Sequence, residues 1–172
     1  MKGTGRLIVM RHAKAGELPG GPDFERALKS RGRNDSAAAG EWLRAGGYLP
    51  EVVLCSAARR ARQTWQYVSE RLLARPQGGE PPGPEPAVQT ERRLYEADAD
   101  DLAEIIRETA ATVGTLMYVG HNPAAADLVA MLTGAEPHFP TAAIAVIDTG
   151  SAWAELAAGD GELAAVWTPS SG

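Results

Sequence analysis

The sequence predicts an α/β fold, a three-layer sandwich in which a mostly parallel central sheet is flanked by helices on both faces. Short apolar runs, typical of buried strands, alternate with longer segments whose apolar residues recur three and four positions apart, as in helices. This alternation favours a parallel sheet, because parallel strands are joined by crossover helices. The chain has 172 residues, of which 44% are hydrophobic and 23% charged. We expect residues 1–172 to form a single globular domain.

The first element is expected to be a strand that is buried on both faces. Residues 7–10 are all apolar, and the run ends abruptly at Arg11 and His12. Residues 16–32 contain glycine, proline and charged residues and are expected to form a loop. Over residues 36–45 apolar side chains lie four apart, which predicts a helix with one apolar face that ends at the two glycines after it.

The middle of the chain repeats this order of strand and helix. Residues 52–55 predict a second strand, and Ser56 is expected to cap the next helix. That helix is indicated by apolar residues three and four apart, namely Ala58, Ala61, Trp65, Val68 and Leu72. Residues 76–86 are rich in proline and glycine, so we expect a surface loop, because proline lacks a backbone donor and glycine adds chain entropy.

The second half of the chain continues the alternation. Three elements follow in order: a short strand at 87–90, a helix marked by Leu102, Ile105, Ile106 and Val113, and a strand at 115–119. Asn122 is expected to cap a fourth helix, with Pro123 as its first residue. Two closing strands are expected at 143–147 and 162–167, with a turn at 159–161. They should be antiparallel, because too few residues separate them for a crossover helix.

Charge and composition exclude several classes of protein. The net charge of -5 argues against a nucleic-acid binder that relies on a broad basic surface. Apolar runs all fall short of the ~20 residues that a membrane-spanning helix needs, and the N-terminal run is too short for a signal peptide. The single cysteine, Cys55, lies in an apolar run and is expected to be a buried hydrophobic residue. A chain without a disulfide framework fits the reducing cytoplasm, where we expect this protein to reside.

Polar residues that suit an anion follow three of the predicted strands. Arg11 and His12 follow the first strand, Arg60 lies just beyond the second, and His121 follows the strand at 115–119. Ligands of open α/β sheets bind beyond the carboxyl ends of the strands. Arginine and histidine donate charge-assisted hydrogen bonds to oxyanions, so these residues predict a phosphate site.

Several motifs along the chain resemble the histidine phosphatase superfamily, which has the phosphoglycerate-mutase-like fold. The resemblance covers nearly the whole chain and rests on Arg11-His12, Arg60-Ala61-Arg62-Gln63-Thr64 and Gly120-His121. Other segments resemble its small SixA-type branch of phosphohistidine phosphatases: Arg11-His12-Ala13-Lys14-Ala15, Leu94-Tyr95-Glu96-Ala97, Gly120-His121-Asn122-Pro123 and Phe139-Pro140-Thr141-Ala142-Ala143-Ile144. One departure is Ala13, because the larger family has glycine after the histidine. Alanine is small enough to keep a close approach of phosphate.

The chemistry of phosphoryl transfer suggests a role for each of these residues. A neutral His12 would attack phosphorus in line and become phosphohistidine, which water then hydrolyses. Arg11, Arg60 and a protonated His121 would stabilise the charge on the phosphoryl oxygens. The resemblance selects Arg60 over the neighbouring arginines, which we expect at the rim or in solvent. We expect no metal and no cofactor, since the acidic residues, histidines and cysteine lack metal-ligand spacing.

Two further residues are candidates for substrate binding. The resemblance suggests that Arg26 lines the pocket, although a loop arginine is as often merely exposed. The larger family places a glutamate after the third strand as an acid, and Glu96 stands at about that place. Its acidic surroundings favour the alternative of a solvated carboxylate at a helix start.

Four functions remain open at this point. The leading one is a phosphatase that acts on phosphohistidine in a partner protein. The second is a phosphatase of a small phosphorylated metabolite that uses the same residues. The third, a mutase, is disfavoured because the short chain leaves little to build a lid. The fourth is a non-catalytic module that binds phosphate, and the intact set of arginines and histidines argues against it.

Overall fold

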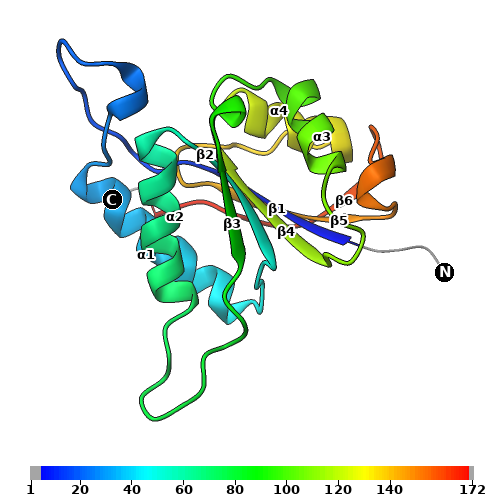
Figure 1. The fold of residues 1–172 in the computed structure, drawn as a ribbon, viewed down its shortest axis with the longest axis horizontal. Coiled ribbons are helices and arrows are strands. Elements are labelled where there is room, and N and C mark those ends of the chain that lie inside the picture. Colours follow the sequence, from blue (N-terminus) through cyan, green and yellow to red (C-terminus); the bar gives the residue numbers. More distant parts are fainter. Residues whose placement is uncertain (1–4, 171–172) are drawn as a thin grey trace.

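The computed structural model describes residues 5–170, which form a twisted six-stranded sheet of order β3-β2-β4-β1-β5-β6 (Figure 1). The strands are β1 (Gly5–Arg11), β2 (Val52–Ser56), β3 (Ala87–Glu91), β4 (Thr115–Gly120), β5 (Ile144–Thr149) and β6 (Gly161–Trp167). Strands β3, β2, β4 and β1 are parallel, whereas β5 pairs antiparallel with both β1 and β6. The mostly parallel sheet and its antiparallel closing pair are therefore confirmed.

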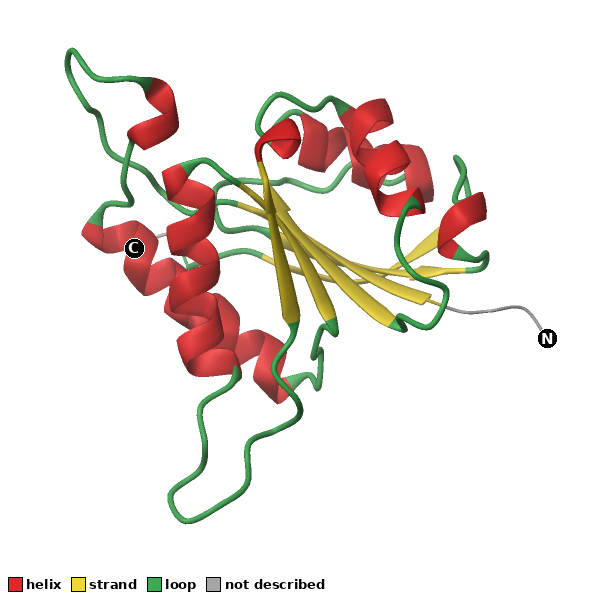
Figure 2. Ribbon diagram, viewed as in Figure 1, coloured by secondary structure: helices red, strands yellow, loops and turns green. Residues whose placement is uncertain are grey.

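Helices cover both faces of the sheet, as Figure 2 shows. On one face lie α1 (Ser30–Ala45) and α2 (Arg59–Leu72), and on the other lie α3 (Ala99–Arg107) and α4 (Ala124–Thr133). Short 3₁₀ turns complete the fold: η1 (Asp23–Glu25), η2 (Arg92–Leu94) and η3 (Trp153–Glu155). The arrangement confirms the three-layer α/β sandwich.

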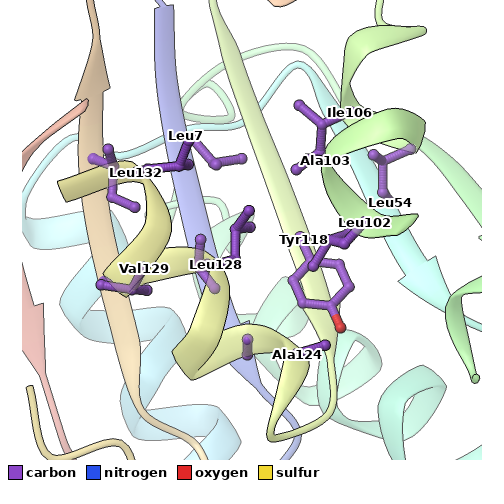
Figure 3. Packing of buried hydrophobic residues seen from close by; sticks show 14 of the residues in the cluster. Leu7, Leu54, Leu102, Ala103, Ile106, Tyr118, Ala124, Leu128, Val129 and Leu132 are labelled. Atoms are coloured by element: carbon purple, nitrogen blue, oxygen red, sulfur yellow. The ribbon is translucent and has the colours of Figure 1, made fainter. Parts of the chain in front are cut away.

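The central strand β1 explains why its sequence is apolar at successive positions. Leu7 and Val9 pack into the cluster beneath α3 and α4, whereas Ile8 and Met10 pack into the cluster beneath α1 and α2. All four side chains are fully buried. Figure 3 shows the first of these clusters, with Leu7 of β1 among the side chains of α4. A strand with helices on both faces has no solvent side, so its apolar residues need not alternate with polar ones.

Helix α1 begins at Ser30, six residues earlier than the segment 36–45 predicts. The glycine at position 32, which the sequence pattern assigns to a loop, lies instead in the first turn of the helix and is buried. A Cβ atom there would lie 2.2 Å from the carbonyl oxygen of Lys14. Glycine is needed here because only a residue without a side chain lets α1 approach the segment after β1 so closely. This requirement outweighs the poor helix propensity of glycine.

Three local predictions are wrong in detail. Ser56 does not cap α2, because it is the last residue of β2 and the helix cap is Ala58. Val113 lies beyond the end of α3, in the turn before β4, where it packs against the core. Helix α4 begins one residue later than predicted, after Pro123, although the Asn122 side chain still accepts a hydrogen bond of 3.2 Å from the Ala126 N–H in its first turn.

The parallel strands all end at one edge of the sheet, and the long loop after β1 projects beyond it (Figure 1). The loop between α2 and β3, residues 76–86, contains no regular structure, as predicted. Within residues 5–170, every helix is too short or too polar to cross a bilayer.

Candidate active site

Two histidines from different strands meet at this edge of the sheet. Arg11 at the end of β1 is paired in register with Gly120 at the end of β4, so the residues that follow them, His12 and His121, emerge side by side. The backbone N–H of His12 donates to the Gly120 carbonyl over 2.8 Å. The centroids of the two imidazole rings are 5.3 Å apart. The parallel register of the sheet thus brings together residues that are distant in sequence.

A basic pocket of about 290 Å³ lies over these rings. Its lining residues are Arg11, His12, Lys14, Ala15, Arg26, Arg60, His121, Asn122 and Thr141. Every charged residue in this set is an arginine or a lysine, although the chain as a whole is acidic. A concave site with several fixed N–H donors and a net positive charge suits a small oxyanion.

The His12 side chain is held in one tautomer. Its Nδ1 atom lies 2.8 Å from the carbonyl oxygen of Ala13, and a carbonyl can only accept, so Nδ1 carries the hydrogen. The lone pair is then on Nε2, to which the Nε–H of Arg60 donates over 3.4 Å. His12 is 8% exposed, and its burial lowers the pKa of the side chain to about 3, with a smaller contribution from the positive charges nearby. At neutral pH the Nε2 atom is therefore unprotonated.

Arg60 is the arginine of α2 that the fold places in the pocket. It is only 6% exposed, whereas Arg59 and Arg62 are exposed to solvent. Its NH1 group donates to the backbone carbonyl of Asp23 over 2.8 Å, and its NH2 group donates to the Asp23 carboxylate over 2.9 Å. The guanidinium is thereby fixed from the loop side while its Nε–H faces His12.

Two buried nitrogen atoms of the pocket residues have no hydrogen-bond partner among the described residues. They are Nε of Arg11, whose NH1 group donates to the Phe139 carbonyl over 3.3 Å, and Nδ1 of His121. Buried polar atoms are normally satisfied, so unpartnered ones in a pocket indicate where a ligand oxygen can bind. Burial lowers the pKa of Arg11.

Ser56 orients the His121 ring. The Nε2 atom lies 2.8 Å from the Ser56 hydroxyl, which also accepts the backbone N–H of Ala58 over 3.2 Å. Burial lowers the pKa of His121 to about 4, and Arg60 adds to this effect. The free side chain is thus neutral at pH 7. This differs from the expected imidazolium, because the sequence carries no information on how deeply the ring is buried.

The two candidate substrate-binding residues lie in different places. Arg26 lines the pocket, where it donates to the Asp23 carboxylate over 2.8 Å and to the Gly16 carbonyl over 3.2 Å. Glu96 lies apart from it: the side chain is exposed and borders a separate surface pocket beside α3. The adjacent residue Tyr95 is the one that faces the site, with its ring centroid 5.6 Å from that of His121.

Sequence reasoning missed several residues of the site. Lys14 and Thr141 lie within segments that carry the family resemblance, so their position could have been inferred. Ser56 was interpreted only as a helix cap. Asp23 and Tyr95 are joined by a hydrogen bond of 2.6 Å from the tyrosine hydroxyl to the carboxylate. Nothing in the local sequence of either residue indicates this contact.

Ala13, where the larger family has glycine, is fully buried in the core and does not line the pocket. Its backbone N–H donates to the Thr64 hydroxyl over 2.9 Å. The extra methyl group therefore does not narrow the space for phosphate. Over residues 5–170, histidine, cysteine, aspartate and glutamate side chains form no cluster of three or more that could hold a metal ion.

No protein-family model matches this chain, but individual proteins and solved structures resemble it over nearly its whole length. An uncharacterized protein of Mycobacterium leprae is 33% identical in an alignment that covers 93% of this chain and 99% of that protein. The structure of SixA from Nakamurella multipartitia, assigned as a phosphohistidine phosphatase, is 30% identical, covers 97% of both chains and has a TM-score of 0.82. The protein histidine phosphatase SixA in complex with tungstate is 25% identical, covers 95% of this chain and 97% of that one, and has a TM-score of 0.76.

Proposed function

Because this chain belongs to the SixA-like branch of the histidine phosphatase superfamily, we propose that it is a phosphatase that removes the phosphoryl group from phosphohistidine on a partner protein. Membership of the superfamily supports phosphatase activity. The observation that carries the proposal is the state of His12, whose Nε2 atom is unprotonated at neutral pH and accepts only a long hydrogen bond from Arg60, which a phosphoryl oxygen would take over, in a basic pocket. A neutral imidazole in this setting is a competent nucleophile towards phosphorus.

The first step transfers the phosphoryl group to the enzyme. The Nε2 lone pair of His12 attacks phosphorus in line and forms a P–N bond, while the P–N bond to the substrate breaks. The substrate ring carries a proton from solvent on its other nitrogen, so it keeps the electron pair of the broken bond and leaves as neutral imidazole. The conjugate acid of imidazole has a pKa of about 6.5, so this leaving group needs little acid assistance.

The second step returns the enzyme to its starting state. A water oxygen attacks the phosphorus of phospho-His12, the P–Nε2 bond breaks, and the electron pair returns to Nε2. The products are inorganic phosphate and one proton that passes to phosphate or solvent. Throughout, the hydrogen on Nδ1 stays with the Ala13 carbonyl, which holds the ring in its orientation.

The pocket offers stabilisation for the charge that moves during both steps. Three equatorial oxygens carry that charge, and fixed donors aimed at them lower the barrier. The two unpartnered nitrogens, on Arg11 and His121, and the Nε–H of Arg60 are the donors we assign to these oxygens. A bound dianion would also favour the imidazolium form of His121. We propose that these groups supply the positive charge without a metal ion.

A comparison of substrates tests this function. We would measure kcat/KM on a phosphohistidine-bearing protein, on an aryl phosphate and on alkyl and sugar phosphates, with a chelator present. We expect turnover of the first two to be far faster than that of alkyl phosphates, and His12→Ala to abolish it. Rapid hydrolysis of sugar phosphates would instead support a phosphatase of small metabolites, and activity restored only by a divalent ion would contradict metal independence.

A further inference from the structure

We propose that Asp23, a residue of the loop after β1, is a positioning residue that holds Arg60 and Arg26 in place for the bound oxyanion. The inference rests on the proposed function, since it concerns how that site is organised. Asp23 does not line the pocket itself, so it acts through the two arginines that do.

The contacts of Asp23 converge on these two side chains. Both terminal nitrogens of Arg60 are held by this one residue, NH1 by its backbone carbonyl and NH2 by its carboxylate. The other carboxylate oxygen accepts from Arg26 Nε over 2.8 Å. Arginine has five N–H donors in a rigid plane, so two fixed donors define where the remaining ones point. For Arg60 these include the Nε–H that faces His12.

Tyr95 supports the same carboxylate. Its hydroxyl donates to Asp23 Oδ2 over 2.6 Å, the oxygen that also accepts from Arg60. This hydroxyl and the two guanidinium groups hold the pKa of the Asp23 carboxyl well below its usual range. The carboxylate therefore stays ionised, and its contacts stay formed, over the whole pH range in which enzymes are assayed.

The loop that carries Asp23 is anchored by aromatic contacts. Phe24 packs edge-on against Tyr95, with ring centroids 4.9 Å apart, and the Arg92 guanidinium lies 4.4 Å from the centre of the Phe24 ring. The turn that these contacts hold lies within the projecting loop seen in Figure 1. A fixed turn is what a positioning role requires, because an arginine is held no better than the group that holds it.

The negative charge of Asp23 also has an effect that opposes anion binding. A negative charge near the pocket weakens its attraction for an anion, so removal of Asp23 could tighten binding. The Asp23 side chain is 50% exposed, however, and water screens its field. Its hydrogen bonds to Arg60 are direct, and the arginine is almost fully buried. We infer that the geometric effect is the larger of the two.

Kinetics of single and double variants test this role. We would compare Asp23→Ala and Asp23→Asn with Glu25→Ala, which removes an exposed carboxylate from the same 3₁₀ turn. For Asp23→Ala we expect kcat to fall about 10- to 100-fold with little change in KM, because preorganised donors act mainly on the transition state. Asp23→Asn keeps one acceptor oxygen and should lose less, and Glu25→Ala should match wild type.

The decisive readout is the coupling to Arg60. If Asp23 acts mainly through this arginine, adding Asp23→Ala to Arg60→Ala should slow kcat by much less than Asp23→Ala slows the wild type, because only its contact with Arg26 is left to lose. The inference would be overturned if the fall in kcat of the double variant equalled the product of the two single falls. An unchanged or raised kcat in Asp23→Ala would also overturn it. Circular dichroism would confirm that each variant is folded.

Tungstate binding separates this inference from the proposed function. We would titrate wild type, Asp23→Ala and Glu25→Ala with tungstate by calorimetry, a measurement that needs no turnover. Weaker binding in Asp23→Ala alone supports the positioning role, and tighter binding overturns it in favour of a charge effect. If wild type failed to hydrolyse any phosphate substrate, the proposed function would be wrong, while the tungstate comparison would still decide the role of Asp23.

Discussion

The Nδ1 atom of His12 donates a hydrogen bond of 2.8 Å to the carbonyl oxygen of Ala13, the next residue in the chain. This contact sets the chemistry of the ring, because it leaves the lone pair on Nε2 at the pocket. The acceptor is a backbone group two residues beyond the end of β1, so a change of side chain at position 13 would leave it in place. The backbone conformation therefore fixes the tautomer of His12 that can act as a nucleophile.

We predict that His12 carries the phosphoryl group during turnover. Enzyme quenched while it hydrolyses substrate should contain phosphate that is labile in acid and stable in base, as expected of a P–N bond. Mass spectrometry of the digested protein should place it on His12, and the label should be absent from His12→Ala. Phosphate found on a serine, or on the buried Cys55, would show that the nucleophile has been misassigned.

Arg60→Ala should slow turnover far more than Arg59→Ala. Removal of one preorganised donor to a transition state typically costs about 10²–10³ in rate. Arg59 neighbours Arg60 in α2 but is exposed, so it is a matched control for the loss of charge. Similar small losses in kcat at both positions would contradict the placement of Arg60 in the pocket.

The two pocket histidines should make the protein less stable in mild acid. Their pKa values are lowered to about 3 and about 4, whereas the unfolded chain protonates histidine near 6.5. Below pH 6.5 the unfolded state therefore binds more protons, and the free energy of unfolding decreases as the pH falls towards 4. Urea unfolding at pH 7 and pH 5 would measure this, and a variant with both histidines replaced by glutamine should lose less stability over the same interval.

Anion binding should raise the pKa of His121. Its unpartnered Nδ1 atom faces a site that we assign to phosphoryl oxygens, and a bound dianion favours the protonated ring. Titration of the ring resonances by NMR, with and without tungstate, would show the shift, and His121→Gln would identify the signal. A resonance that titrates at the same pH in both conditions would contradict a contact between His121 and the anion.

Glu96→Gln should have little effect on the turnover of phosphohistidine. The carboxylate is exposed and borders a pocket on the α3 side, away from the two histidines. We expect kcat to stay within about twofold of wild type, since an imidazole leaving group needs little acid assistance. A large fall in kcat would mean that the loop after β3 rearranges to bring this carboxyl group to the substrate.

Gly32→Ala should cost both stability and activity. The new methyl group would lie 2.2 Å from the Lys14 carbonyl oxygen, so α1 or the segment after β1 must shift. Overpacking of this kind typically costs about 1–3 kcal/mol, and a shift of Lys14 would disturb the pocket it lines. Gly83→Ala is the control, because its methyl group would meet only the Leu49 side chain at 3.4 Å. Denaturant unfolding and kcat would be measured on both.

The central strands could be predicted from the sequence because they are buried. A strand such as β1, covered on both faces, produces an unbroken apolar run that the sequence reveals directly. The start of α1 was missed because Gly32 is a loop signal locally, while its cause is a contact with a distant carbonyl group. Ser56 was missed for a similar reason: a serine after a strand is a typical cap, and only the fold brings His121 to it.

The candidate site was only partly predictable. Arg11, His12 and His121 stand where strands end, and that position is visible in the sequence pattern. Asp23 and Tyr95 are not, because their contact depends on how a long loop folds back over the sheet edge. Loops are placed by tertiary contacts rather than by periodic patterns, so their partners emerge only from the structure.

The central place of β1 in the sheet has a consequence for synthesis of the protein. This strand is synthesised before the other five, and its neighbours β4 and β5 are made only when residues 115–149 have been translated. Until then its apolar side chains and both rows of backbone hydrogen-bonding groups lack their native partners, which favours pairing with other chains. Assembly through such distant pairings is slow compared with local folding. A fragment that stops before residue 144 should therefore aggregate, even though it contains both pocket histidines.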